Sequence, residues 1–245
     1  GHIRRYYQQL TRLCAAFALL ADVSMLVVGG ALKRKEKLSG RLGDILSQLY
    51  LCSAALKRFE DDGRPEADLP LLYWSLQDAL YRIEMAIDGL LQNFPNRFIA
   101  VMLHLMIFPT GKPFALPSDR LGHQVSDLLL NPGDARNRLT RGIYLPREEG
   151  EIVADLERAL AGAIECEAVE AKVRAAVRRG EITAAKWEEQ VKEALARGTL
   201  TVRDQEVLER QKQLRRAVIM VDDFPADFGR RAAAAGAPAP EKSAA

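Results

Sequence analysis

A chain of 245 residues, 48% of them hydrophobic, can bury a core in one large domain or in two smaller ones. Its 35 Lys and Arg nearly balance its 33 Asp and Glu, and a net charge of +2 excludes a strong overall field, so we expect no nucleic-acid partner. The three cysteines, Cys14, Cys52 and Cys166, are too scattered for a disulfide framework or a zinc knuckle, which predicts a cytoplasmic location.

The composition predicts an all-α fold, because Ala, Leu, Arg and Glu dominate and lose little freedom in a helix. Residues 4–28 form the first predicted helix, which is so apolar that we expect most of it to be buried. It still falls short of the roughly 20 apolar residues that span a bilayer. Gly29 and Gly30 should break it. Apolar residues three and four positions apart predict two further helices, over 38–59 and 69–94, in an antiparallel bundle.

Residues 98–108 are almost continuously apolar but too short to span lipid, so we expect a buried helix or one that contacts a membrane. The basic run at 33–37 would suit anionic lipid, because each basic group near a charged bilayer contributes about 1 kcal/mol. Such a run is more often a solvated helix end. The candidate residues for contact with a membrane or a partner are Lys33, Arg34, Lys35, Lys37, Phe98, Met102 and Phe108.

Prolines and glycines occur too often in residues 109–146 for long helices to form there. Only 118–130 should form one there, with Ser118 as its N-cap. Three more helices are predicted, over 148–179, 183–197 and 201–220. Each begins with acidic residues or a Thr, and the first two end with basic residues, as the helix dipole favours. The predicted organisation is a long-helix bundle (1–108), a Pro- and Gly-rich connector (109–146), a C-terminal helical segment (147–228) and a disordered Ala- and Pro-rich tail (229–245).

No pattern of residues points to catalysis. The chain has no Gly-x-Gly-x-x-Gly dinucleotide-binding motif, no Walker loop and no Gly-x-Ser-x-Gly nucleophile elbow. Its three histidines are too scattered for most metal sites. Glu84 and Asp88, one helical turn apart, could act as acid and base in a dry pocket, but a solvated face is favoured. His104 is favoured as a core residue over a ligand. We therefore assign no catalytic, cofactor-binding or metal residue.

Two further features have a functional and a structural interpretation. His123 could contact a phosphate or an acyl-CoA head group, but its position in a predicted helix favours a structural role. Four aromatic residues lie at helical spacings and could line an acyl tunnel, although packing between helices needs fewer assumptions. They are Tyr73, Trp74, Tyr81 and Phe94.

Several ordered strings resemble a known family. They lie at 5–10, 20–25, 38–50, 108–111, 131–140 and 221–224. The most extended reads Leu-Ser-Gly-Arg-Leu-Gly-Asp-Ile-Leu-Ser-Gln-Leu-Tyr, and another reads Asn-Pro-Gly-Asp-Ala-Arg-Asn-Arg-Leu-Thr. Over about residues 4–228 the chain resembles the C-terminal region of bacterial long-chain acyl-CoA dehydrogenases.

The resemblance implies a part in fatty-acid β-oxidation. In this family a glutamate removes the α-proton of fatty acyl-CoA, FAD accepts the β-hydride to leave trans-2-enoyl-CoA, and electrons pass to an electron-transfer flavoprotein. The glutamate and the flavin site lie upstream of the matched region, so the resemblance implies FAD in the parent enzyme and no cofactor in this chain.

We therefore expect an accessory domain with three kinds of partner. It would pack on the rest of the dehydrogenase chain, assemble homo-oligomers, or touch the inner-membrane surface as a peripheral protein. The alternative is a stand-alone helical protein that binds a partner or a membrane surface and has no catalytic role.

Overall fold

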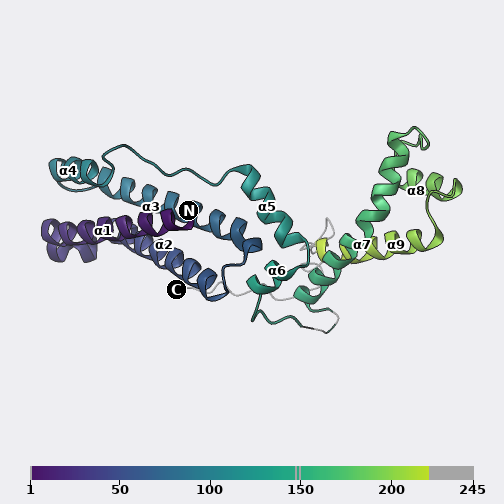
Figure 1. Ribbon diagram of the computed structural model, residues 1–245, viewed down its shortest axis with the longest axis horizontal. Helices are drawn as coiled ribbons and strands as arrows, with labels where there is room; N and C mark the ends of the chain where they lie inside the picture. Colours follow the sequence, from purple (N-terminus) through teal and green to yellow (C-terminus); the bar gives the residue numbers. More distant parts are fainter. Residues whose placement is uncertain (1, 147, 149, 221–245) are drawn as a thin grey trace, which may run out of the picture. The chain divides into compact units, whose positions relative to one another are not determined.

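The computed structural model describes residues 2–146, 148 and 150–220 (Figure 1). These residues form nine α-helices and no strand, which confirms the all-α prediction. The chain divides into two compact units, Gly1–Arg141 and Gly142–Ala245, which we call unit 1 and unit 2. The string at 221–224 and the predicted tail lie outside the described residues.

Unit 1 begins with three long helices that pack side by side, as Figure 1 shows. A 3-10 helix, η1 (Gly29–Arg34), joins the first two, and Gly29 takes the left-handed backbone, with φ +55°, where the break was expected. After the second helix Gly63 also takes a positive φ of +83°, and its N–H donates to the Glu60 carbonyl oxygen over 3.1 Å. The helices are α1 (His2–Val28), α2 (Glu36–Asp61) and α3 (Leu69–Gln92), with a short 3-10 helix, η2 (Glu66–Asp68), before the third.

One hydrophobic core joins these helices to α4 (Arg97–Ile107). The spacing of apolar residues places one stripe of each helix inward, as the sequence predicts, and full burial of one such side chain contributes about 1.5–3 kcal/mol. The most deeply buried large apolar side chains of unit 1 are Leu13, Leu20, Ile45, Leu56, Leu76, Ile83, Ile87, Leu90 and Leu103.

The first helix is more exposed than predicted. Leu10, Leu13 and Leu20 pack in the core, but only 17% of the most apolar 18-residue window is buried. By length and composition alone the helical stretch Ile3–Arg34 could cross a membrane, so the expectation that no stretch is apolar enough was wrong. Helical structure continues through the glycines into η1, which makes the apolar stretch longer than the sequence pattern suggested.

Two short helices follow in the connector. In α5 (Asp119–Leu130) the Ser118 hydroxyl accepts a hydrogen bond from the Leu121 N–H over 3.3 Å, so the expected N-cap is present. The sequence did not predict α6 (Asp134–Leu139). It is held by a tertiary contact, because the Arg138 guanidinium donates two hydrogen bonds, of 2.9 and 2.6 Å, to the Asp68 carboxylate.

Unit 2 contains α7 (Ile152–Arg178), α8 (Trp187–Ala196) and α9 (Val202–Ile219). Thr201 and Asp204 form a capping box at the start of α9, each side chain accepting a hydrogen bond from the other's N–H. A second hydrophobic cluster joins the three helices, with buried residues Val169, Val173, Ala176, Ile182, Ala194 and Leu200.

The start of α8 differs from the prediction, which placed it at Thr183. The Glu193 carboxylate accepts hydrogen bonds from the N–H groups of Thr183 and Ala184, over 3.1 and 3.2 Å. The Gln190 amide also donates to the Ala184 carbonyl oxygen over 2.9 Å. These contacts satisfy the backbone in a loop, so the helix begins four residues later, at Trp187.

Candidate functional site

α4 is fixed to unit 1 along one face. The Asn96 side chain caps its start by accepting a hydrogen bond from the Ile99 N–H over 3.2 Å. Ala100, Leu103 and Ile107, three and four positions apart, are buried in the core. The Arg12 guanidinium of α1 donates to the Ile107 carbonyl oxygen over 3.3 Å, which ties the end of α4 to the middle of α1.

The opposite face of α4 is apolar and exposed to solvent. Exposed fractions along it are 80% for Phe98, 54% for Val101, 45% for Met102, 63% for Leu105 and 60% for Met106. We call these five residues the apolar face of α4. A large contiguous apolar surface of this kind marks a site of interaction, because isolated soluble domains rarely expose one.

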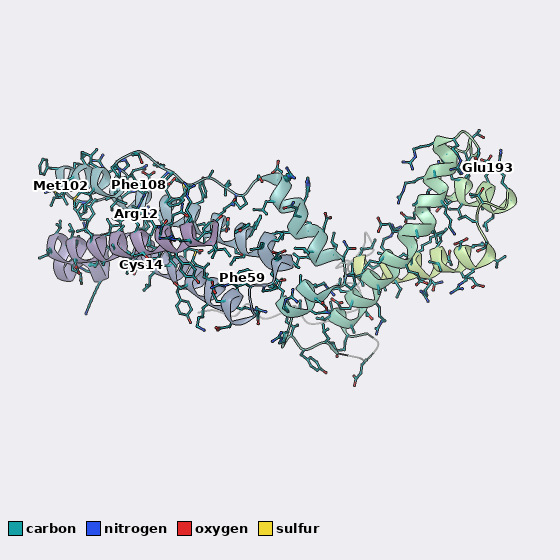
Figure 2. The ribbon with its side chains drawn as sticks, in the orientation of Figure 1. Arg12, Cys14, Phe59, Met102, Phe108 and Glu193 are labelled. Atoms are coloured by element: carbon teal, nitrogen blue, oxygen red, sulfur yellow. The ribbon has the colours of Figure 1, made fainter. Side chains whose placement is uncertain are left out.

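Four basic side chains lie at the turn between α1 and α2, and we call them the basic turn. Lys33, Arg34, Lys35 and Lys37 are all exposed, and one exposed carboxylate, Glu36, lies among them. Figure 1 shows α4 at the same end of unit 1 as this turn, and Figure 2 places Met102 at that end. Apolar surface and an excess of positive charge therefore share one end of unit 1.

The residues expected to contact a membrane or a partner are thus mostly available. The basic turn, Phe98 and Met102 are exposed, but Phe108 is only 2% exposed and belongs to the core. Its ring lies 5.6 Å from that of His104, so Phe108 packs within unit 1 and offers no contact surface. The half-buried His104 has the packing role that the sequence favoured.

Part of the surface was not predicted. Val101, Leu105 and Met106 extend it along α4, and Met25 and Leu26 add exposed apolar area at the end of α1, being 55% and 83% exposed. The three positions on α4 follow the helical spacing of Phe98 and Met102, but a run that is apolar nearly throughout carries no signal of which face stays exposed.

Glu84 and Asp88 hold the connector against α3. The Glu84 side chain is 2% exposed and accepts a hydrogen bond from the Phe114 N–H over 3.0 Å. Asp88 forms an ion pair with Lys112 at 2.7 Å and accepts from the Gln92 amide at 2.8 Å. The solvated face favoured for the pair is therefore wrong for Glu84, and both carboxylates have structural partners.

The aromatic candidates have mixed surroundings, because Trp74 is 37% exposed and Tyr81 is half-buried. The Tyr73 ring stacks on Tyr6 with centroids 5.8 Å apart, and Phe94 is buried in the core of unit 1. His123 is exposed on α5. No group of three or more metal-ligating side chains occurs within the part of the chain that the structure describes.

A family model described as acyl-CoA dehydrogenase, C-terminal, bacterial type, matches residues 1–224. The chain belongs to this family. The resemblance carried by the ordered strings is thereby confirmed, and the match takes in every helix from α1 to α9. No solved structure matches the chain significantly. For this bacterial-type C-terminal domain, the apolar face of α4 and the basic turn are the candidate functional site.

Proposed function

We propose that this C-terminal domain holds a FAD-dependent acyl-CoA dehydrogenase of fatty-acid β-oxidation on an anionic membrane surface. The observation that carries the proposal is the shared end of unit 1, where the apolar face of α4 lies with the basic turn. Apolar side chains enter the interfacial region of the bilayer, and basic side chains beside them bind lipid phosphates.

The magnitudes support binding through both kinds of group. Burial of a Phe side chain contributes up to about 3 kcal/mol, and Phe98 has 80% of its surface to bury. The four cations and Glu36 give residues 33–37 a net charge of +3, which adds about 3 kcal/mol at a charged bilayer, at about 1 kcal/mol per charge. Neither contribution alone gives firm attachment, but the two together reach the range of a stable peripheral contact.

In this proposal the flavin and the catalytic glutamate belong to the rest of the parent chain. Among the described residues Glu84 is the only acidic residue that is buried, and its carboxylate already accepts a hydrogen bond from the Phe114 N–H. It is therefore not poised as a base. We therefore route no chemical step through the described residues.

Flotation with vesicles tests the proposal. The chain should float with vesicles of equal parts phosphatidylglycerol and phosphatidylcholine at low salt, and much less with pure phosphatidylcholine. The double variant Lys33→Glu and Lys35→Glu should lose the preference for anionic vesicles. The matched control, Arg4→Glu with Arg5→Glu, changes exposed charges at the start of α1 and should keep it. Equal loss in both variants, or no flotation of the wild type, contradicts the proposal.

A second candidate function rests on another exposed apolar segment. Ile143, Tyr144 and Leu145 are 60%, 82% and 51% exposed. We propose that this segment packs on the rest of the dehydrogenase chain. Hydrogen exchange at 143–145 should be slower in the whole enzyme than in the 245-residue chain alone. Equal exchange rates in the two would contradict this role.

A further inference from the structure

The register of the antiparallel helices α1 and α2 brings two of the three cysteines to the same level. The Tyr7 hydroxyl donates to the Glu60 carboxylate over 3.4 Å, which fixes the register of the two helices. Seven residues make nearly two turns of an α-helix. Two turns along α1 from Tyr7 is Cys14, and two turns back along α2 from Glu60 is the position of Cys52 and Ser53.

The surroundings of the two thiols agree with this register. Cys52 is 2% exposed, and burial raises its pKa to about 11, with a further increase from the neighbouring Cys14. The influence of Cys14 agrees with its place across from Cys52 in the register of the two helices. Cys14 itself is exposed on α1, where Figure 2 labels it. Cys14 is therefore exposed to solvent, and Cys52 is buried.

Cys166 has no such neighbour. It is buried in unit 2, and its thiol donates a weak hydrogen bond to the Glu170 carboxylate over 3.8 Å. Burial, followed by the charge of Glu170, raises its pKa. It serves as an internal reference for a thiol with no partner thiol.

We propose that Cys14 and Cys52 are a modification site, at which a hydroperoxide converts the two thiols into a reversible disulfide between α1 and α2. The Cys14 thiolate attacks the outer peroxide oxygen, the O–O bond breaks, and an alcohol or water leaves. Cys14 is then a sulfenic acid. The Cys52 sulfur, giving up its proton, attacks the Cys14 sulfur, the S–O bond breaks, and the hydroxide leaves as water.

The two steps remove two electrons and two protons from the thiols and reduce one hydroperoxide. A dithiol reductant restores both thiols by exchange. The exposed Cys14 meets the oxidant, whereas the buried Cys52 is shielded from it. The bond fastens α1, the most exposed of the long helices, to the bundle at its middle. The proposed disulfide does not depend on the proposed membrane contact.

Peptide mass spectrometry after brief treatment with hydrogen peroxide tests the site. The chain is then alkylated under denaturing conditions and digested with trypsin. We expect a cross-link between the peptides that contain Cys14 and Cys52, a loss of two hydrogen masses, and an alkylated Cys166. Dithiothreitol should reverse the link. The oxidised chain should unfold several degrees above the reduced one, because the bond closes a long loop.

Three variants separate this site from other oxidation chemistry. Cys52→Ala should abolish the link and leave a Cys14 sulfenic acid that dimedone traps, whereas Cys166→Ala should keep the link. Cys14→Ala should leave Cys52 unoxidised, with circular dichroism confirming that each variant folds. A link between two Cys14 residues of different chains, or a Cys14 sulfinic acid beside an alkylated Cys52 in the wild type, overturns the proposal.

Discussion

Replacing Phe98 with serine should weaken binding to anionic vesicles by about 30-fold. Phe98 is 80% exposed in the free chain, so a membrane can bury most of its ring. Full burial of a Phe side chain contributes up to about 3 kcal/mol, and we take about 2 kcal/mol for this partly covered ring. Each 1.4 kcal/mol or so is a factor of ten in affinity, which gives the expected change. Co-sedimentation over a range of lipid concentrations measures it.

The fold should tolerate this substitution, because changes at exposed positions alter stability by about 0.5 kcal/mol or less. Leu116→Ser is a matched control, since Leu116 is 58% exposed but lies in the connector. It should bind vesicles like the wild type. Raised salt should weaken the wild type and Phe98→Ser by the same factor, because salt screens the basic turn and leaves the apolar contribution unchanged. If Phe98→Ser bound anionic vesicles as tightly as the wild type, the reasoning would be refuted.

Three further predictions concern stability. Glu84→Ala should cost about 2 kcal/mol, because it leaves the Phe114 N–H unpaired, and hydrogen exchange should quicken at Phe114. Gly63→Ala should cost about 1 kcal/mol in urea unfolding, because Gly63 holds φ at +83°. Hydrogen bonds from Thr201 and Lys172 lower the pKa of Asp204 to about 2 from 3.8. The ionised Asp204 therefore stabilises unit 2 fully above its unfolded pKa, and this stabilisation is lost as the pH falls towards 2. In Asp204→Asn the melting temperature should fall less steeply with decreasing pH over that range.

The long helices could be predicted because each of their sequences repeats one apolar stripe. Gly29, Gly63 and Ser118 mark ends that the chain does adopt. Local patterns of this kind do not predict contacts between residues that are far apart in the sequence. α6 depends on the ion pair of Arg138 with Asp68, seventy positions away, and no pattern near residues 134–139 predicts this helix.

The candidate site could be predicted only in part. Residues 98–108 are apolar nearly throughout, so the pattern did not decide which face of α4 turns inward. The hydrogen bond from Arg12 to the Ile107 carbonyl oxygen and the packing of Leu103 decide it. The same packing buries Phe108, which the sequence had assigned to the contact surface.

The measurement that tests the central claim most directly is the fluorescence of tryptophan at position 98. In a chain with Trp74→Phe and Trp187→Phe, the variant Phe98→Trp should emit at shorter wavelength when vesicles containing phosphatidylglycerol are added. Brominated acyl chains should quench that emission. Unchanged, unquenched emission while the chain sediments with the vesicles would show that α4 stays in water, and it would contradict the account.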